Sequence, residues 1–430
     1  MKTEELYNYF LKFRKISIDS RTAEKNSLFF ALKGDNFDGN KYAQKALNNG
    51  CALAVVDDPN CVNGDKYFLV DNVLETLQEL GNYHRRKLDI PIIAITGTNG
   101  KTTTKELTSC VLNSTFKVSY TKGNLNNHIG VPLTLLSMDE ETQIGIVEMG
   151  ANHLNEIELL CKITEPNYGI ITNIGRAHLE GFGSYDNVIK AKTELYNYIN
   201  DKGGTIFYNS NDTLLKSKIN DLEFKSISYG DKGSKVTGEL KGSDKFLEMN
   251  VLINEEEIEL KTQLVGSYNF DNVLAAASIG NYFKIKAQLI VDALKKYTPQ
   301  NNRSQFLKTA KNNIYLDAYN ANPSSVHASV LNFLSLEISN KIIILGDMLE
   351  LGNDSIKEHK KIVELINKEH VKRKIVIGNI YNSLTVPDNF IQFKNVDELI
   401  AWISDNKIEN SNILIKGSRG IGLEKAVEQL

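Results

Sequence analysis

Short apolar runs alternate with stretches of helical periodicity along most of the chain. Runs of this kind indicate strands that are buried on both faces, as in a parallel sheet covered by helices. In the middle of the chain they predict strands at Ile92–Thr96, Ile144–Met149, Tyr168–Asn173 and Gly204–Asn209. We therefore expect a mostly parallel sheet with helices packed on both of its faces.

The first part of the chain repeats this alternation on a smaller scale. Strands are predicted at Ser27–Leu32 and Ala52–Val56, and helices at Asn40–Asn49 and Val73–Lys87. Pro91 cannot continue a helix, so it separates this segment from the strand that follows. The pattern predicts a small N-terminal α/β domain over residues 1–88.

A pattern of period two lies between Leu222 and Leu264. Within it, Lys245–Ile253 alternates between polar and apolar residues, which is typical of a half-buried strand. We expect an antiparallel appendage here, attached to a central domain over residues 89–300.

The last part of the chain returns to strands and helices in turn. Strands are predicted at Ile342–Leu345, Lys374–Ile377 and Asn412–Ile415, with helices at Ser355–Glu369 and Val396–Asn406 between them. The polar stretch Pro299–Arg303 marks the start of this C-terminal domain, over residues 301–430. The chain is therefore predicted to be α/β, with a small N-terminal domain, a central parallel sheet and a C-terminal Rossmann-like domain.

Composition and charge exclude several classes of protein. A chain of 430 residues is too long for one core, in agreement with three domains. The formal net charge of −3 argues against a nucleic-acid binder, since such proteins carry a basic footprint. The cysteines are far apart, so neither a disulfide framework nor a zinc site is indicated. No apolar run approaches the roughly 20 residues of a bilayer span, and no signal peptide is evident, so we expect a cytoplasmic protein without membrane insertion. We expect a monomer, although the sequence itself leaves the oligomeric state open.

The candidate chemistry lies in Ile92–Lys105, where an apolar strand is followed by a Gly-rich turn and the start of a helix. Gly97 and Gly100 let the backbone N–H groups point inward, and Lys101 can reach the outer phosphates of a nucleotide. The Thr102 hydroxyl can hold Mg²⁺, and the helix N-terminus adds partial positive charge. The turn predicts a P-loop that binds a mononucleotide in the central domain.

This loop departs from the usual phosphate-loop pattern in one respect. Two residues separate its glycines, where the usual pattern has four. The alternative interpretation is a Gly-rich turn between strand and helix with an incidental lysine. Phosphate binding is favoured because the strand, both glycines and the Lys-Thr pair coincide in the context that the mechanism requires.

Further polar residues follow the predicted strands, in the crevice where open parallel sheets bind ligands. Glu148 ends an apolar strand, where its charge is costly unless a metal ion, a helix N-terminus or an arginine compensates it. His178 by itself is more typical of a structural histidine, but beside a phosphate site it is a candidate ligand of metal or phosphate. Lys192 lies on a helical stretch whose charges indicate a solvated face, so composition does not single it out.

Strings in all three segments, in order along the chain, resemble the Mur ligases. They are Thr96-Gly-Thr-Asn-Gly-Lys-Thr-Thr, Gly123-Asn-Leu-Asn-Asn-His-Ile-Gly-Val-Pro-Leu, Glu148-Met-Gly-Ala-Asn-His, Ala177-His-Leu-Glu-Gly-Phe-Gly-Ser, Ala318-Tyr-Asn-Ala-Asn-Pro, Gly346-Asp-Met-Leu-Glu-Leu-Gly and Lys416-Gly-Ser-Arg. Folylpolyglutamate synthases share the phosphate loop, but they are not expected to carry the strings at 318–323 and 346–352. The resemblance implies the three-domain fold of the Mur ligases.

The resemblance also implies roles for individual residues. Catalytic roles are implied for Lys101, Glu148, His178 and Lys192, the last as a lysine that CO₂ converts to an anionic carbamate. Two Mg²⁺ ions are implied, with ligands among Thr102, Glu148, His178 and Lys192. The implied ATP contacts are Gly97, Thr98, Asn99, Gly100, Lys101, Thr102, Thr103, Asn269, Asn272, Arg303 and Asp317. The implied substrate contacts are Ser20, Arg21, Asn126, Asn127, Asn320 and Asn322.

The implied activity is ATP-dependent formation of an amide bond through an acyl phosphate, in peptidoglycan precursor synthesis. Within the family, the strings are most similar to the enzymes that join D-alanyl-D-alanine to UDP-N-acetylmuramoyl-tripeptide. Two alternatives stay open. One is a related ligase that adds a different amino acid, although the Asp-Asn-Pro-Arg string for a diamino acid is absent; the other is a P-loop ATPase without ligase activity. The residues also leave open whether the tripeptide ends in diaminopimelate or lysine.

Overall fold

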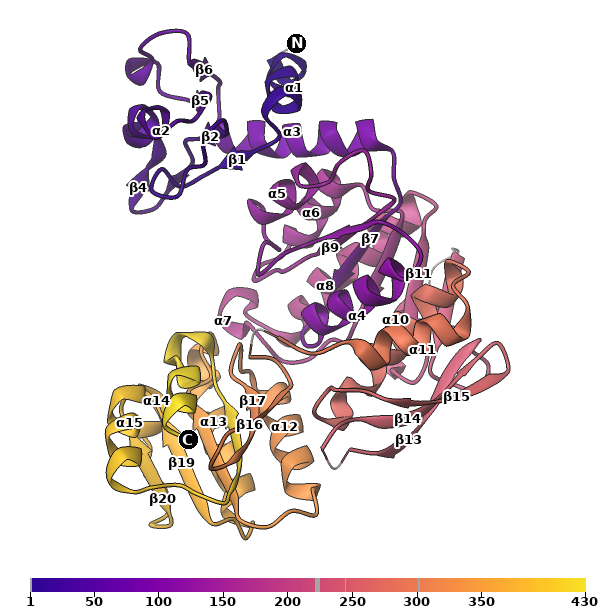
Figure 1. The fold of residues 1–430 in the computed structure, drawn as a ribbon, viewed down its shortest axis with the longest axis vertical. Helices are drawn as coiled ribbons and strands as arrows, with labels where there is room; N and C mark the ends of the chain where they lie inside the picture. Colours follow the sequence, from indigo (N-terminus) through magenta and orange to yellow (C-terminus); the bar gives the residue numbers. More distant parts are fainter. Residues whose placement is uncertain (1, 221–224, 244, 301) are drawn as a thin grey trace.

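The chain folds into three α/β domains that follow one another along the long axis of the molecule (Figure 1). The structure is a computed structural model that describes residues 2–220, 225–243, 245–300 and 302–430. None of the described helices is long and apolar enough to cross a membrane. The predicted three-domain α/β fold is confirmed, whereas the boundaries at residues 88 and 300 stay predictions.

The N-terminal domain is built on a parallel sheet with the order β1-β2-β5-β6. Its strands, with a small hairpin, are β1 Ile16–Ser17, β2 Leu28–Phe30, β3 Lys33–Gly34, β4 Phe37–Asp38, β5 Leu53–Val56 and β6 Tyr67–Leu69. Its helices are α1 Lys2–Phe13, α2 Ala43–Asn48 and α3 Val73–Leu88. The predicted elements are present; β2, β5 and α2 are shorter than predicted, and α3 is one residue longer. Helix α1 was missed, although its buried Leu6, Tyr7 and Phe10 have the spacing of one helix face.

The central domain is built on a sheet with the order β12-β11-β10-β7-β9-β8, whose described pairs are all parallel. Its strands are β7 Ile92–Thr96, β8 Val118–Tyr120, β9 Ile144–Glu148, β10 Tyr168–Ile171, β11 Thr205–Asn209 and β12 Lys225–Tyr229. Its helices are α4 Lys101–Asn113, α5 Gly130–Leu136, α6 Glu156–Thr164, α7 Leu179–Phe182, α8 Tyr185–Asp201, α9 Thr213–Asn220, α10 Phe270–Tyr282 and α11 Ala287–Lys296. The predicted parallel sheet is confirmed.

Helix α3 connects the N-terminal domain to the central domain. Asn72 caps its start, since its side chain accepts from the N–H groups of Leu74 and Glu75 at 2.9 and 3.1 Å. The helix ends at Asp89, which is left-handed with φ 47°. Between these ends α3 contacts α1 of its own domain and both α5 and α6 of the central domain (Figure 1). It therefore packs against the cores of both domains.

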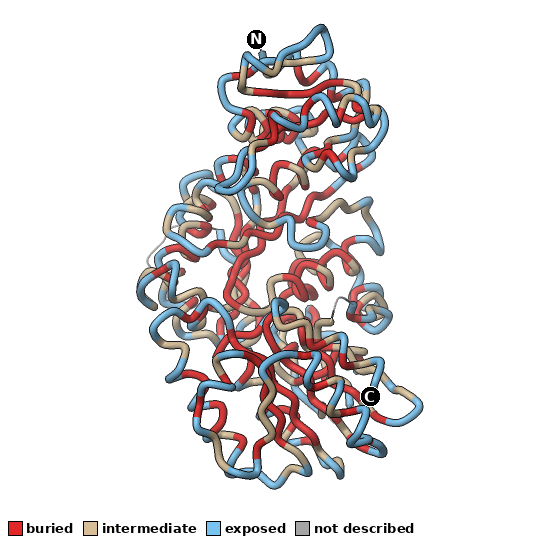
Figure 2. The backbone as a smooth tube through the Cα atoms, turned by 90° about the vertical axis from the view of Figure 1, so that its left-hand side faces the viewer, coloured by how far each residue is buried: buried red, intermediate tan, exposed pale blue. Residues whose placement is uncertain are grey.

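Buried residues form a band within each domain (Figure 2). In the central domain they lie on both faces of the sheet, because adjacent residues of a strand point to opposite faces. Ile93 and Ile95 of β7 belong to one apolar cluster, and Ile92 and Ala94 belong to another. This double burial explains why β7 is a continuous apolar run in the sequence.

The period-two segment forms an antiparallel sheet of β13 Val236–Gly242, β14 Glu248–Ile253 and β15 Glu256–Lys261. The buried residues of β14 alternate as predicted, and the strand packs against α10. The prediction is wrong for β12, which pairs in parallel with β11 as an edge of the central sheet. An edge strand is less covered, so its pattern is also mixed. Residues 222–224 and 244 of the segment lie outside the described residues.

The C-terminal domain is built on a sheet with the order β16-β17-β21-β18-β19-β20, parallel except for the pair β16 and β17. Its strands are β16 Gln305–Lys308, β17 Asn313–Asp317, β18 Lys341–Gly346, β19 Arg373–Ile377, β20 Phe390–Phe393 and β21 Asn412–Lys416. Its helices are α12 Pro323–Ser335, α13 Ser355–Asn367, α14 Asn379–Asn382 and α15 Val396–Asp405. The predicted Rossmann-like arrangement is confirmed. Among the missed strands, β16 and β20 are edges with few buried residues.

Candidate active site

The phosphate loop follows β7, which lies where the strand order reverses, with β8 and β9 on one side and β10, β11 and β12 on the other. β7 lies between β9 and β10, and both run parallel to it. Parallel strands end at the same edge, so Glu148 at the end of β9 and Asn173 just after β10 lie near the loop. The N–H of Thr98 donates to the carbonyl of Asn173 at 2.9 Å, and the N–H of Asn99 donates to Asn173 Oδ1 at 3.0 Å. The loop is therefore anchored at the crevice predicted for ligands.

Protein packing itself requires both glycines of the loop. Gly97 has φ 143°, and a Cβ there would lie 2.0 Å from Oγ1 of Thr172. Gly100 has φ 78°, and a Cβ there would lie 2.5 Å from Oδ1 of Asn272. Side chains with a Cβ rarely adopt such positive φ values. The spacing of two residues between the glycines is therefore compatible with a tight turn.

We expect Gly97→Ala to destabilise the protein and to abolish nucleotide binding. The new methyl group would overlap the Thr172 hydroxyl, and strain at positive φ adds roughly 1–3 kcal/mol. Urea unfolding and titration with a fluorescent ATP analogue provide the measurement. Gly123→Ala is the control, because Gly123 has φ 55° and nothing lies within 4 Å of a Cβ built there. Equal unfolding free energies in the two variants would contradict this prediction.

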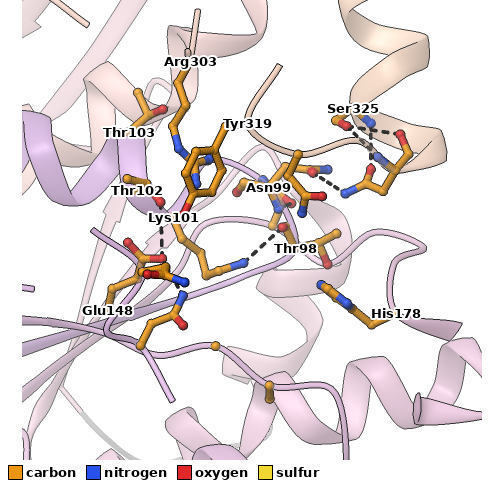
Figure 3. A pocket seen from close by; sticks show the side chains of 18 of the residues that line it. Thr98, Asn99, Lys101, Thr102, Thr103, Glu148, His178, Arg303, Tyr319 and Ser325 are labelled. Atoms are coloured by element: carbon orange, nitrogen blue, oxygen red, sulfur yellow. Dashed lines mark hydrogen bonds between the residues drawn. The ribbon is translucent and has the colours of Figure 1, made fainter. Parts of the chain in front are cut away.

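Lys101 is the first residue of α4 and lies beside the loop. Its Nζ donates to the carbonyls of Gly97 and Thr98 at 2.7 and 3.2 Å (Figure 3). Burial lowers the pKa of Lys101, while Glu148 raises it and Arg303 lowers it further. An anionic phosphate oxygen is a stronger acceptor than a carbonyl. The ammonium can therefore exchange its loop partners for a phosphate.

Glu148 is almost completely buried and has one unsatisfied oxygen. Its Oε1 accepts from Thr102 Oγ1 at 3.2 Å and from Asn126 Nδ2 at 2.9 Å (Figure 3). Its Oε2 accepts no hydrogen bond from a described residue and lies 3.7 Å from Nζ of Lys105. The long ion pair with Lys105 offsets part of the cost of burying this carboxylate, and Oε2 keeps lone pairs that a metal ion could use.

The pair of Thr102 and Glu148 fits a Mg²⁺ ion whose coordination a nucleotide would complete. Mg²⁺ in nucleotide sites is usually held by one or two carboxylates together with phosphates and waters. Within the described ranges, no three His, Cys, Asp or Glu side chains form a candidate metal cage. The Thr102 hydroxyl and the Glu148 carboxylate match a site in which the phosphates of a bound nucleotide complete the coordination of Mg²⁺.

A cavity of about 740 Å³ lies between the central and C-terminal domains. Its lining includes the predicted residues Thr98, Asn99, Gly100, Lys101, Thr102, Thr103, Asn126, Asn127, Glu148, His178, Asn269, Asn272, Arg303, Asp317, Asn320 and Asn322. The predicted residues outside the lining are Gly97, Lys192, Ser20 and Arg21. The fold therefore brings most of the predicted site into one space.

The C-terminal domain contributes Arg303 and Asp317 to this cavity. The guanidinium carbon of Arg303 lies 3.6 Å from the ring centroid of Tyr319 (Figure 3). Nζ of the buried Lys416 donates to Asp317 Oδ2 at 2.5 Å. Stacking and a charged hydrogen bond therefore hold both predicted ATP contacts in place. Tyr319 and Lys416 were missed as site residues, although both lie in strings that carried the family resemblance.

Asn269 and Asn272 lie where α10 begins, beside the phosphate loop. Asn272 Nδ2 donates to Asn269 Oδ1 at 2.9 Å, and Asn272 Oδ1 accepts from Thr104 Oγ1 at 3.1 Å. Asn269 Nδ2 donates to Ser304 Oγ of the C-terminal domain at 3.1 Å. These amides bond to protein groups at the cavity wall, and their contact with the base of ATP stays a prediction.

Direct hydrogen bonds join the phosphate loop to the C-terminal domain. Asn322 Nδ2 donates to Asn99 Oδ1 at 2.7 Å, and Asn99 Nδ2 donates to Ser324 Oγ at 2.9 Å. Asn322 also caps α12, where its side chain accepts from the N–H of Ser325 (Figure 3). The loop that is predicted to bind phosphate is therefore held directly to the C-terminal domain.

Lys192 is buried, with 2 % of its surface exposed, so the solvated helix face suggested by composition is wrong. It shares the buried face of α8 with Val188, Leu195 and Ile199, at spacings of three or four residues, a signal that the sequence contained. Among the described residues, none makes a hydrogen bond or ion pair with its Nζ, which lies 5.7 Å from the centroid of the Phe182 ring. Burial lowers the pKa of Lys192 to about 7.

Ser20 and Arg21 lie in the N-terminal domain, outside the lining of the cavity. Ser20 is buried. Arg21 is exposed, and its guanidinium pairs with Asp19 at 2.6 Å. A role for these two residues with the UDP end of a substrate stays a prediction.

Family models match the chain in three consecutive parts. "Mur ligase family, catalytic domain" matches residues 12–95, and "Mur ligase middle domain" matches residues 95–280. "Mur ligase, glutamate ligase domain" matches residues 302–419. The matches follow the order of the three domains.

Curated relatives resemble the chain over nearly its whole length. The UDP-N-acetylmuramoyl-tripeptide--D-alanyl-D-alanine ligase of Bacillus subtilis (strain 168) is 32% identical over 438 residues, which cover 96% of this chain and 92% of the relative. The ligase of the same name from Rickettsia prowazekii (strain Madrid E) is 33% identical over 429 residues, which cover 96% of this chain and 94% of the relative.

Solved structures share the architecture of all three domains. MurF from Acinetobacter baumannii, crystal structure I, superposes with a TM-score of 0.87 at 29% identity, covering 97% of this chain and 93% of that chain. The MurF ligase from Thermotoga maritima, solved in complex with ADP, has a TM-score of 0.86 at 23% identity and 97% coverage of both chains. The second similarity concerns the fold alone.

Proposed function

This chain belongs to the Mur ligase family, and we propose that it joins D-alanyl-D-alanine to UDP-N-acetylmuramoyl-tripeptide in an ATP-dependent reaction. Relatives named for this reaction match the chain from end to end. The product is a precursor of peptidoglycan, which assigns the enzyme to cell wall synthesis.

One observation carries the proposal: a phosphate loop and residues of a second domain meet at a single cavity. Lys101 comes from the central domain, and Arg303 and Asp317 come from the C-terminal domain. At about 740 Å³ the cavity lies well within the size of small-molecule sites and exceeds what a phosphate group alone requires. This arrangement suits a reaction in which a nucleotide and a second reactant must be positioned together.

In the first step, an oxygen of the terminal tripeptide carboxylate attacks the γ-phosphorus of ATP. The new O–P bond forms an acyl phosphate, the bond to the β,γ-bridging oxygen breaks, and ADP leaves. The two anionic reactants repel each other. Lys101 and the N-terminus of α4 offset this repulsion because they present positive charge to the γ-phosphate oxygens.

In the second step, the amine of D-alanyl-D-alanine attacks the acyl carbon. A C–N bond forms, phosphate leaves with the electron pair of the C–O bond, and the amine loses a proton. Water would hydrolyse the acyl phosphate, so the site must exclude it. The hydrogen bond that Asn99 accepts from Asn322 and the one that it donates to Ser324 support closure of the C-terminal domain over the loop.

Two Mg²⁺ ions belong to the proposal. Thr102 and Glu148, whose oxygens are 3.2 Å apart, would hold the first, and His178 and Lys192 would hold the second. Bound Mg²⁺ supplies positive charge that neutralises the phosphate oxygens. The unsatisfied Oε2 of Glu148 is the feature of this chain that supports the first ion.

Lys192 can bind a cation only if its own charge is reversed. The lone pair of a neutral Nζ can attack the carbon of CO₂, which forms an N–C bond, releases a proton and leaves a carbamate anion. Because burial lowers the pKa of Lys192 to about 7, a substantial fraction of the amine is neutral near pH 7. For an ordinary lysine this fraction is on the order of 1 in 2,500. The environment of Lys192 therefore favours the modification.

The remaining contacts concern the peptide and UDP ends of the substrates. We assign Ser20 and Arg21 to the UDP end, because they lie in the N-terminal domain, away from the nucleotide cavity. Asn126, Asn127, Asn320 and Asn322 are assigned to the peptide substrates, since all of them line the cavity. The proposed enzyme acts in the cytoplasm as a monomer, and sedimentation of the purified protein tests the oligomeric state.

A substrate panel tests the proposed function. The protein is incubated with ATP, with UDP-N-acetylmuramoyl-tripeptides ending in diaminopimelate or lysine, and with D-alanyl-D-alanine or single amino acids. We expect one amide product by mass spectrometry, and ADP release over many turnovers only when both substrates are present. ADP release without them would indicate a P-loop ATPase, and a product with a different amino acid alone would contradict the proposed dipeptide specificity.

A further inference from the structure

Glu350 connects the C-terminal domain to His178 across the cavity. Glu350 Oε2 lies 2.5 Å from His178 Nδ1, and both residues line the cavity. The two side chains form an ion pair when the His178 imidazole is protonated, and Nδ1 makes no hydrogen bond of regular geometry with the described residues. The family resemblance assigned a role to His178 but none to Glu350.

Both residues of the contact have an unusual backbone conformation. Glu350 has φ 65° and His178 has φ 51°, values that residues other than glycine rarely adopt. Such conformations persist only where the surrounding structure determines them, and they often mark functional sites. The contact is therefore a built feature of the two loops.

The turn before Glu350 is anchored to the C-terminal domain through Asp347. The carboxylate of Asp347 accepts from the N–H groups of Ile380 and Tyr381, both at 2.9 Å, at the start of α14. A Cβ at Gly378 would lie 2.2 Å from this carboxylate, so glycine is needed for the close approach. Asp347 therefore fixes one end of the turn in the buried part of the domain.

The next residues of the turn are anchored as well. The N–H of Met348 donates to His359 Nε2 at 3.0 Å, and the N–H of Leu349 donates to Ser418 Oγ at 3.0 Å. With consecutive N–H groups bonded in this way, the backbone presents Glu350 to the central domain in one orientation.

A second contact lies beside this pair. The short helix Gly352–Asp354 of the C-terminal domain contacts α7 of the central domain, which begins just after His178. A Cβ at Gly352 would lie 3.3 Å from Cβ of Glu180, so glycine allows the two segments to approach closely. Figure 1 shows α7 at the boundary between the two domains.

We propose that Glu350 is a positioning residue that holds the C-terminal domain against His178 and couples domain closure to the placement of that histidine. The inference rests on the proposed function, because that function places His178 at the nucleotide. The side chains of His178 and Glu350 are 24% and 58% exposed, so solvent weakens their attraction. Loss of the pair should lower the fraction of protein molecules in which the C-terminal domain is closed against the central domain. The apparent KM for ATP should then rise by the same factor, while kcat stays nearly unchanged.

Hydrogen exchange of the substrate-free protein tests the contact directly. In Glu350→Gln we expect amides in peptides 176–184 and 346–354 to exchange about threefold faster, within the fivefold that a partly exposed ion pair supports. The KM for ATP should rise by a similar factor. In a protein that already carries His178→Ala, Glu350→Gln should cause no further increase in amide exchange, because the partner of Glu350 is already lost.

Glu364→Gln is the matched control. Glu364 is exposed on α13 and makes no hydrogen bond or ion pair with the part of the chain that the structure describes, so its exchange and KM should equal the wild-type values. Unchanged exchange in Glu350→Gln, or effects that simply add to those of His178→Ala, would overturn the proposal. Exchange is measured without substrate, so its outcome is separate from that of the substrate panel.

Discussion

Lys101→Ala is expected to lower the rate of amide formation by about a hundredfold to a thousandfold, the range for loss of one preorganised charge-stabilising donor. Lys101 Nζ already lies in the phosphate loop, bonded to the carbonyls of Gly97 and Thr98. Alanine would remove the Lys101 ammonium, which offsets the repulsion between the tripeptide carboxylate and the γ-phosphate. The loss should appear in kcat, since this charge matters most in the transition state.

Folding of Lys101→Ala should be nearly unchanged. Burial lowers the pKa of Lys101, which means that its charged form is disfavoured in the folded protein relative to the unfolded chain. Steady-state turnover at saturating ATP and urea unfolding provide the measurements. Lys190→Ala is the control, because Lys190 is exposed on α8 and lies outside the cavity lining. Turnover near the wild-type value would show that the loop assignment is wrong.

Lys192→Ala is expected to lower activity about tenfold to a hundredfold, the range for groups that orient metal ligands. Alanine would remove the carbamate beside the second Mg²⁺, and a small carboxylate such as acetate should restore part of the activity by filling the space. Lys192→Arg should not respond to acetate, because its guanidinium stays cationic. Lys190→Ala, two positions earlier on the same helix, should keep full activity.

The modification of Lys192 can also be observed directly. With isotopically labelled bicarbonate, the wild-type protein should show a carbamate carbon by NMR that is absent in Lys192→Ala. Full activity in Lys192→Ala together with no carbamate signal in the wild-type protein would reject the assignment. The buried amine of Lys192 would then have a role in packing alone.

The secondary structure of the sheets was largely predictable from the chain. Strand β7 matches its predicted range at both ends, because a strand covered on both faces must be apolar throughout. Edge strands are harder to predict, since fewer of their residues are buried. For this reason β16 and β20 were missed and β12 was placed in the wrong sheet.

The Gly-rich turn between β7 and α4 was also predictable, because its geometry is local, whereas phosphate binding there stays a prediction. Gly97, Gly100, Lys101 and Thr102 are neighbours in the chain, and their spacing alone predicts a turn whose N–H groups and cation face one ligand. Family resemblance extended the prediction to Arg303, Asp317 and other residues of the cavity lining, although not to Tyr319 or Lys416. It did not predict what holds those residues in place.

Residues within one helix or loop, such as Lys101 and Thr102, could be assigned from the sequence by itself, because backbone geometry relates neighbours in a regular way. The periodicity of α8 placed Lys192 on a face with apolar residues, but only the tertiary structure decided that this face is buried and that Glu350 contacts His178. Burial depends on what packs against a helix face. Contacts between distant segments depend on the order of the strands and on how the domains meet, and local periodicity contains neither.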